Sequence, residues 1–324
     1  MIYRTATLLV ASFLTSSTVD GLPLTPLEST ELLTSNTKCG VSVTDSQLNS
    51  AIVGKLDAGG GLAFSTGWSP TVDYVVSTST TGMKSVIWAA SADGNEFFSV
   101  KPKVHDPVSD MLQGVNEPDG VPSVGSKPAT PEEYAATWVA VVDEARTLGY
   151  TRFAGPQMES EITSNPDKGL QWQIRFMKQL DIELGKTGAK KSDYLTHVSY
   201  HIYEPNCLND ANGIAGYHKT QMEAWKDGLK EWWGEYDLKG FVVSELACAP
   251  WSRDGTLAGQ MNMVQHVLPQ MLAWSEIEYV SWFSAPSAGG DIHDKAHYLW
   301  TNGPDELTTL GEAYLNVCHS TSSI

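Results

Sequence analysis

The chain has 324 residues, of which 41% are hydrophobic, and this is enough for a globular protein with one large domain or two ordinary ones. Its 38 acidic and 21 basic residues give a formal net charge of −17, which disfavours binding to nucleic acid and to anionic membrane surfaces. This charge suits a neutral or cationic partner. Alternatively, the acidic surface only keeps the protein in solution.

The first twenty residues have the pattern of a secretory signal peptide. Arg4 supplies a short positive region, residues 6–14 are almost all apolar, and small polar residues follow. This apolar stretch is too short to span a membrane, and no other segment approaches that length. We expect a signal peptide over residues 1–20, a flexible leader over 21–38 and one ordered domain over 39–320. The protein would be secreted, to the extracellular space or the cell wall.

Beyond the leader, short β-rich runs alternate with longer amphipathic stretches. Residues 45–57 could form a first short helix, and three glycines at 59–61 then interrupt the chain. The β-rich runs are candidate strands: Leu62–Trp68, Val72–Ser77, Ser85–Ala90, Met111–Val115, Thr151–Gly155, Leu195–Tyr203, Gly240–Ser244 and Tyr279–Ser284. The clearest amphipathic helices between them cover residues 130–148, 169–184, 215–233 and 258–275.

Strands that alternate with helices indicate an α/β fold with a parallel sheet. Eight strands are the number that closes into a (β/α)8 barrel, the TIM-barrel fold, within a single domain. The alternative is an open, doubly wound sheet, but no strand here is followed by the glycine-rich phosphate-binding loop typical of that fold. We therefore predict a barrel, with its active site at the carboxyl ends of the strands.

Two glutamates stand at the ends of candidate strands. Glu117 follows the fourth strand in an Asn-Glu-Pro sequence, and Pro118 should hold it in an extended conformation. Glu245 ends the apolar seventh strand, where burying an unpaired carboxylate would cost several kcal/mol. Glu117 alone could instead cap the next helix, and Glu245 alone could pair with an Arg or Lys, although none lies nearby in its strand. Strands four and seven face each other across a barrel, which brings the carboxyl groups to the ~5 Å separation of a retaining glycosidase.

Two more kinds of side chain accompany the glutamates. On the sixth strand, His201 and Tyr203 share one face, and a hydrogen bond from either would hold Glu245 of the neighbouring strand in its ionised form. His201 could also be a core histidine with satisfied hydrogen bonds. Tryptophans end or follow several strands and together suit a platform for a sugar ring, although each could singly belong to the core. They are Trp68, Trp88, Trp251 and Trp282.

Taken in order, these segments resemble glycoside hydrolase family 128, fungal β-1,3-glucanases of a large clan of retaining (β/α)8 enzymes. The resemblance covers about residues 62–315, and residues 307–315 resemble the closing helix of the family. Ile202 stands where the family usually has an aromatic residue. The segments that carry the resemblance are Asn116-Glu117-Pro118-Asp119, His201-x-Tyr203, Ser244-Glu245 and Trp282-Phe283.

The resemblance implies a hydrolase of β-1,3-glucan that acts by double displacement. Glu117 would be the acid/base, Glu245 the nucleophile, and Asn116 would hydrogen-bond the sugar 2-hydroxyl. The partner would be a β-glucan polysaccharide or oligosaccharide, cleaved internally. We expect a monomer with no cofactor and no metal. Two alternatives are a β-glucan-binding or cell-wall remodelling protein with little turnover, and a secreted interaction protein in which the two glutamates lie apart.

Four cysteines in a secreted chain should form two disulfides, for which three pairings exist. In the predicted barrel, Cys207 and Cys248 lie in the loops that leave the adjacent sixth and seventh strands. Barrel closure brings the first strand beside the eighth, and with them Cys39 near the start of the domain and Cys318 near its end. We therefore predict the disulfides Cys207–Cys248 and Cys39–Cys318.

Overall fold

The structure is a computed structural model that describes residues 38–43, 64–67, 84–88, 95–100, 111–120, 130–159, 162–283, 295–301 and 306–321. The chain divides into two units, residues 1–34 and 35–324, and all the described residues belong to the second. Several predicted features lie outside the described residues: the signal peptide, the leader as far as residue 37, the helix at 45–57, the strand Val72–Ser77 and Trp68.

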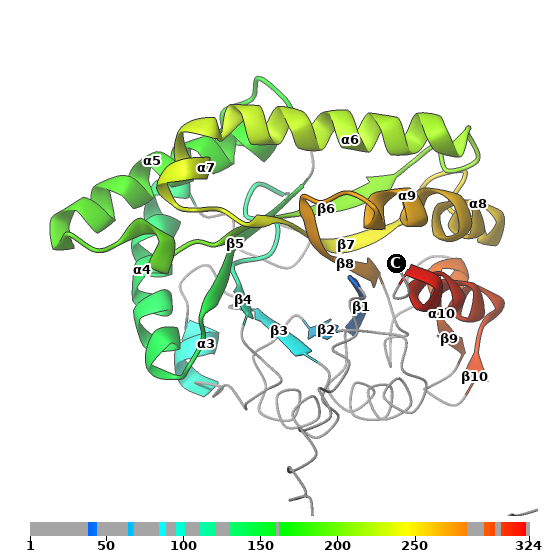
Figure 1. The fold of residues 1–324 in the computed structure, drawn as a ribbon, viewed down its shortest axis with the longest axis horizontal. Helices are drawn as coiled ribbons and strands as arrows, with labels where there is room; N and C mark the ends of the chain where they lie inside the picture. Colours follow the sequence, from blue (N-terminus) through cyan, green and yellow to red (C-terminus); the bar gives the residue numbers. More distant parts are fainter. Residues whose placement is uncertain are drawn as a thin grey trace, which may run out of the picture. The chain divides into compact units, whose positions relative to one another are not determined.

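Eight parallel strands form one sheet (Figure 1). In chain order they are β1 Cys39–Val43, β2 Phe64–Gly67, β3 Lys84–Trp88, β4 Met111–Gln113, β5 Arg152–Glu159, β6 His197–Glu204, β7 Gly240–Cys248 and β8 Ile277–Phe283. Each strand pairs with the next one, and β1 also pairs with β8, so that the sheet closes on itself. The predicted parallel α/β fold is therefore confirmed.

The first strand differs from the sequence-based prediction. That prediction counted strands from Leu62, whereas the first strand is β1, with the sequence Cys-Gly-Val-Ser-Val. Only two valines mark this segment as β-forming, because glycine and serine have little preference for strands. β2 lies within the predicted run Leu62–Trp68, and β3 overlaps the predicted run Ser85–Ala90.

Helices lie outside the ring of strands (Figure 1). They are α3 Asn95–Val100, α4 Pro131–Thr147, α5 Gly169–Thr187, α6 Ala211–Gly228, α7 Lys230–Glu235, α8 Leu257–Asn262, the π-helical turn η2 Met263–Val267, α9 Leu268–Leu272 and α10 Thr309–Thr321. Shorter elements are η1 Lys191–Asp193, η3 Lys295–His297, and the antiparallel pair β9 Trp300–Thr301 and β10 Glu306–Leu307. In the part of the chain that the structure describes, no helix is both long and apolar enough to cross a membrane.

Local sequence explains where two of these helices begin and break. Thr130 and Glu133 form a capping box at the start of α4, in which each side chain accepts a hydrogen bond from the other residue's backbone N–H at 3.2 Å. The single helix predicted over residues 258–275 is instead interrupted by η2. Pro269 lacks the N–H for a helical hydrogen bond and crowds the preceding turn, so the backbone widens into a π-turn before it.

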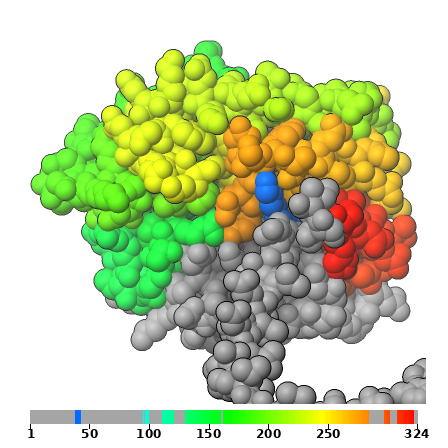
Figure 2. Space-filling view, viewed as in Figure 1, coloured from blue at the N-terminus to red at the C-terminus, as the bar shows by residue number. Residues whose placement is uncertain are grey.

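Both predicted disulfides are present, each with its Cα atoms 5.8 Å apart. Cys39–Cys318 joins β1 to α10, where the Tyr314 hydroxyl also donates a hydrogen bond to the carbonyl of Gly40. Figure 2 shows the atoms of β1 (blue) between the region that ends in β8 (orange) and α10 (red). The two ends of the described chain therefore meet beside the closure of the sheet.

The side chains inside the sheet change in character along the strands. A small apolar cluster, separate from the main core, consists of Met111, Ala154, Val242 and Tyr279. Further along β7, Ser244 shares a hydrogen bond of 3.0 Å with Ser199 of β6. Ser42 of β1 donates to the Ser244 carbonyl and lies 2.6 Å from the Ser281 hydroxyl of β8. The interior is thus apolar at one level and polar toward the carboxyl ends, where the next residue on β7 is Glu245.

Candidate active site

The segment after β4 places Glu117 at the rim of the sheet. The Glu117 N–H donates to the Gln157 carbonyl of β5 at 2.8 Å, and the Gly120 N–H donates to the Glu117 carbonyl at 2.9 Å. Glu117 has a φ of 40°, so the expectation that Pro118 holds it extended is wrong. The two backbone hydrogen bonds close a turn that a non-glycine residue enters only at a cost of about 1–3 kcal/mol. Such strain is typical of functional residues.

A β-bulge aims Glu245 into the same space. On β7, the hydroxyl of Ser244 bonds inward to Ser199, and the next side chain, Glu245, also points inward to Tyr203 of β6. Consecutive residues of a regular strand face opposite sides, so one register shift is needed. The pairing of β6 with β7 has that shift, because Tyr200 pairs with Val243 and His201 pairs with Glu245.

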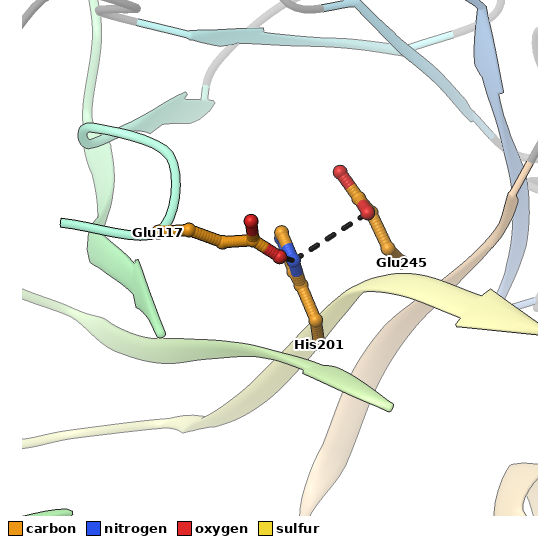
Figure 3. A group of neighbouring side chains, drawn as sticks. All are labelled: Glu117, His201 and Glu245. Atoms are coloured by element: carbon orange, nitrogen blue, oxygen red, sulfur yellow. Dashed lines mark hydrogen bonds and ion pairs between the residues drawn. The ribbon is translucent and has the colours of Figure 1, made fainter. Parts of the chain in front are cut away.

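His201 lies between the two glutamates (Figure 3). Its Nδ1 atom is 2.9 Å from Oε1 of Glu117 and 3.4 Å from Oε2 of Glu245. The Tyr203 hydroxyl donates a hydrogen bond to Oε2 of Glu245. His201 and Glu245 are buried, and the side chain of Glu117 is 11% exposed. The sequence-predicted pair and the strand-six residues therefore meet in one cluster.

The charges of this cluster support one another. Burial alone would raise the pKa of Glu117, but the hydrogen bond and charge of His201, with a smaller contribution from Lys168, lower it overall. Burial alone would lower the pKa of His201, but the charges of Glu245 and Glu117 raise it. Burial and the charge of Glu245 raise the pKa of Tyr203 well above its usual range, which keeps its hydroxyl a donor. In the free protein, a proton is therefore stabilised on His201 between two carboxylates.

One carboxylate oxygen each of Glu117 and Glu245 and one ring nitrogen of His201 all lie within 4.8 Å of one another. One imidazole nitrogen and two carboxylate oxygens at this spacing are geometrically able to hold a divalent ion. The same spacing suits two carboxyl groups that act on one glycosidic bond. The Tyr203 hydroxyl donates to Oε2 of Glu245, and a proton on Nδ1 of His201 can be donated to Oε1 of Glu117, so hydrogen bonds within the cluster reach both carboxylates.

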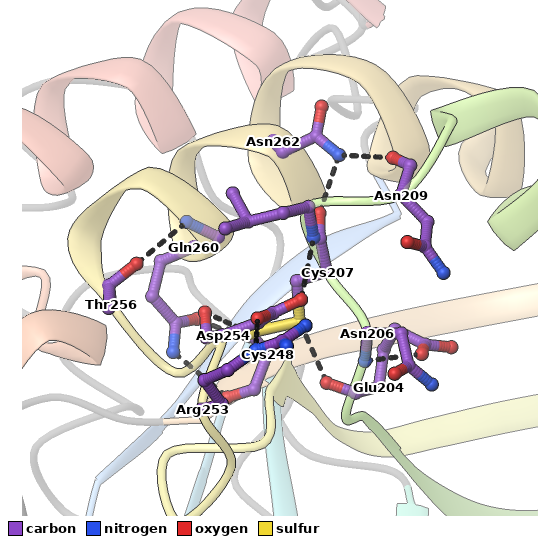
Figure 4. The surroundings of a disulfide bond; sticks show 12 residues. Glu204, Asn206, Cys207, Asn209, Cys248, Arg253, Asp254, Thr256, Gln260 and Asn262 are labelled. Atoms are coloured by element: carbon purple, nitrogen blue, oxygen red, sulfur yellow. Dashed lines mark hydrogen bonds and ion pairs between the residues drawn. A yellow bond between two sulfur atoms is a disulfide. The ribbon is translucent and has the colours of Figure 1, made fainter.

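The loops beside Glu245 are anchored to α8 (Figure 4). The disulfide Cys207–Cys248 joins the loop after β6 to the end of β7. The side chain of Gln260 accepts from the Cys248 N–H at 3.0 Å and donates to its carbonyl at 2.9 Å, and Asn262 donates to the Cys207 carbonyl at 2.6 Å. These contacts fix the rim three residues beyond Glu245.

The tryptophans divide into two groups. Trp251 is 64% exposed, and its ring centroid lies 4.9 Å from that of Tyr203, so it offers a face beside the glutamates. Trp282 is buried instead: its indole N–H donates to the His297 carbonyl at 3.0 Å, and its ring packs against Tyr314. The expectation that Trp282 forms the floor of a sugar site does not match this burial. The Trp282 side chain lies in the hydrophobic core beside α10.

The remaining predicted residues are placed only in part. Asn116 is half-buried beside Glu117 and pairs through its backbone with Gln157. Trp88 ends β3, and its side chain is not among those that the structure describes. The structure adds Phe283, whose ring lies 5.6 Å from that of Tyr203. Phe283 follows Trp282 in the sequence, and strand alternation alone could have identified it as the residue facing the other way.

Comparisons with known proteins identify the family of the chain. A family model described as glycosyl hydrolase catalytic core matches residues 54–314. No curated protein matches the chain. Several solved structures share the fold at low sequence identity.

Three of them are members of glycoside hydrolase family 128. A subgroup II endo-β-1,3-glucanase from Pseudomonas viridiflava has a TM-score of 0.61 and 18% identity over 86% of this chain and 96% of that chain. A subgroup I endo-β-1,3-glucanase from Amycolatopsis mediterranei, in complex with laminaripentaose, has a TM-score of 0.59 and 18% identity over 87% and 99%. A subgroup VII oligosaccharide-binding protein from Cryptococcus neoformans has a TM-score of 0.56 and 16% identity over 90% and 98%.

At these sequence identities the solved structures show only that the fold is shared. The assignment of the chain to a family rests on the family model. It spans most of the chain and includes both glutamates. The chain therefore belongs to the glycosyl hydrolase catalytic core family and is a glycoside hydrolase.

Proposed function

We propose that the protein is a secreted, retaining β-1,3-glucanase that cleaves glucan chains internally, built on a complete (β/α)8 barrel. The observation that carries this proposal is the separation of Glu117 and Glu245: a carboxylate oxygen of one lies within 4.8 Å of a carboxylate oxygen of the other. Retaining glycosidases hold their carboxyl groups about 5–5.5 Å apart, whereas inverting ones need about 6.5–9.5 Å. The likeness to β-1,3-glucanases supports the substrate class, and the two disulfides support secretion.

The reaction would proceed by double displacement. Glu245 attacks the anomeric carbon, while protonated Glu117 gives its proton to the departing glycosidic oxygen. Water then attacks the glycosyl-enzyme, with Glu117 as the base that takes its proton. The hydrogen bond from Tyr203 favours the ionised form of Glu245. The proton that Glu117 needs for the first step comes from His201, across their hydrogen bond of 2.9 Å.

The substrate would be held by groups around this pair. Asn116 hydrogen-bonds the sugar 2-hydroxyl, and a neighbouring ring of the glucan stacks on the exposed face of Trp251, beside Tyr203. Trp68 and Trp88 stay predictions for further sugar contacts. The barrel acts as a monomer on a neutral polysaccharide and uses no metal or cofactor.

Product analysis on β-1,3-, β-1,4- and β-1,6-glucans tests the proposal. Laminarin, a soluble β-1,3-glucan, should be cleaved to a ladder of oligosaccharides, and the first product should keep the β configuration. The second candidate function is oligosaccharide binding with little turnover, which the likeness to a subgroup VII oligosaccharide-binding protein favours. Laminarin bound by the pure protein but not cleaved would select this second function.

Glu117→Ala should lower kcat on laminarin about 10²- to 10⁴-fold, because the departing sugar oxygen then lacks its proton donor. On an aryl laminaribioside with a good leaving group, the first step needs no proton. The second step then limits turnover, because no base remains to take a proton from water. Azide attacks the glycosyl-enzyme without a base, so adding it should restore turnover of this substrate and form a β-glycosyl azide. Both results come from steady-state kinetics and product chromatography. Glu223→Ala, which removes an exposed carboxylate from α6, is the control and should leave both rates unchanged. Near-normal laminarin cleavage by Glu117→Ala would contradict the assignment.

Trp251→Ala should weaken the binding of laminari-oligosaccharides about fivefold or more, because it removes an exposed stacking face worth about 1 kcal/mol. Calorimetry on an inactive Glu245→Gln background measures the affinity without cleavage. Ile182→Ala removes a comparably exposed apolar side chain from α5 and should have no effect. Equal affinities of the Trp251 variant and its parent would remove Trp251 from the site.

A further inference from the structure

We propose that Asp119 is a positioning residue for Glu117, which it holds in place by tying the segment 116–120 to β5 and to the start of α5. The inference rests on the proposed role of Glu117 as the acid/base. Neither the sequence motif nor the proposed reaction assigns a task to Asp119. Its place in the structure does.

Asp119 supplies the cap that α5 lacks. The residue before this helix, Lys168, makes no capping hydrogen bond with its side chain. The N–H of Gly169, the first residue of α5, instead donates to Oδ2 of Asp119 at 2.7 Å, across 50 residues of sequence. A carboxylate is stabilised at a helix N-terminus by such a bond and by the helix dipole. The catalytic segment is thereby bonded to a long helix of the barrel.

The other oxygen of Asp119 reaches the end of a strand. Oδ1 accepts a hydrogen bond from the N–H of Glu159, the last residue of β5, at 3.4 Å. Asp119 is 4% exposed, so both contacts are shielded from water. One buried side chain therefore bridges the ends of β4 and β5 and the beginning of α5.

Glu117, two residues away, needs such support. Its φ of 40° is strained for a non-glycine residue, and such a conformation persists only where the surroundings fix it. The backbone bonds to Gln157 and Gly120 fix one side of the turn. Space at Gly120 is already tight, because an added Cβ would lie 3.0 Å from the Glu117 carbonyl oxygen. Asp119 fixes the other side of the same turn.

The charges around Asp119 fit this role better than that of a simple cap. Burial raises the pKa of Asp119 to about 6, and the nearby carboxylate of Glu159 also raises it, so ionising this side chain is costly. Lys168 pairs with Glu159 at 3.3 Å and lowers the pKa of Glu117. The charge of Asp119 also helps to hold the proton on His201. Loss of the Asp119 carboxylate would displace Glu117 and lower the pKa of His201. Both changes act on the step in which Glu117 donates a proton to the departing sugar oxygen.

The test compares two substrates in Asp119→Asn. With laminarin, whose leaving oxygen must be protonated, kcat should fall about 10- to 100-fold, because a small misplacement of a catalytic group costs about this much. With an aryl laminaribioside that has a good leaving group, kcat/KM should fall less than about threefold, since it reports on glycosylation, which then needs no acid. KM for laminarin should change little. Asp210→Asn is the matched control: Asp210 caps α6 through the Gly213 N–H at 2.8 Å and should leave both rates unchanged.

Equal losses on both substrates, or no loss on either, would show that Asp119 only caps α5, while Glu117 could still be the acid/base. If Asp119→Asn does not fold, the same comparison is made with Asp119→Ser. The serine side chain is smaller, and its hydroxyl can accept a hydrogen bond from one of the two N–H groups. A measurement without turnover separates this inference from the proposed function. In either variant the pKa of His201, followed by NMR of the imidazole, should fall. An unchanged value would overturn the coupling even if the parent protein cleaved no glucan.

Discussion

Glu245→Gln should lower kcat on laminarin by about four orders of magnitude or more, since removing a covalent nucleophile typically costs this much. The amide has the size of the carboxylate, and its oxygen can still accept the hydrogen bond of Tyr203. The fold should therefore remain, with an unfolding midpoint close to that of the parent. Laminari-oligosaccharides should still bind, because the substitution removes the attacking oxygen and not the sugar contacts.

Glu204→Gln provides the matched control for this experiment. Glu204 ends β6, is as buried as Glu245, and faces away from the site toward His218 of α6, with 3.2 Å between Nε2 and Oε2. The same substitution there should change kcat by less than about threefold, although it can lower stability because it weakens the buried contact with His218. If Glu245→Gln kept a tenth of the parent's turnover on laminarin, Glu245 would not be the nucleophile, and the retaining mechanism would fail with it.

The positions of the two glutamates could be predicted from sequence because strand ends are easy to recognise. Each follows an apolar run that stops abruptly, and parallel strands carry their functional residues at one edge. The same reasoning predicted both disulfides, since Cys207 and Cys248 follow adjacent strands and the ring closes between β1 and β8. These inferences depend on strand order, which survived the error in the first strand.

Features that depend on irregular backbone were not predictable in the same way. The left-handed conformation of Glu117 runs against the preference imposed by Pro118, and the bulge at Ser244 leaves no mark on the alternation of residues in β7. Tertiary packing decided the environment of Trp282, which sequence could not distinguish from an exposed platform. The bond from Asp119 to Gly169 joins elements that local patterns treat separately.

The disulfide Cys39–Cys318 should contribute more to stability than the disulfide Cys207–Cys248. It spans 279 residues, whereas Cys207–Cys248 spans 41. The chain-entropy treatment then gives about 5–6 kcal/mol for the long loop and about 4 kcal/mol for the short one, as upper values. A typical domain has only about 5–15 kcal/mol of stability in total. Replacing Cys39 and Cys318 by serine together should therefore lower the free energy of unfolding by a large fraction.

Activity should respond in the opposite order, because the two links hold different parts of the barrel. Cys39–Cys318 ties β1 to α10, where β1 is also held by its pairing with β2 and β8 and by Tyr314. Cys207–Cys248 lies three residues beyond Glu245 and fixes the rim of the site.

Urea unfolding and laminarin kinetics of the two double serine variants separate these effects. The long-loop variant should lose more stability yet keep most of its kcat at low temperature, while the short-loop variant should lose more kcat. A larger loss of stability in the short-loop variant would mean that native packing around α8, and not the entropy of the unfolded chain, sets the contribution of each disulfide.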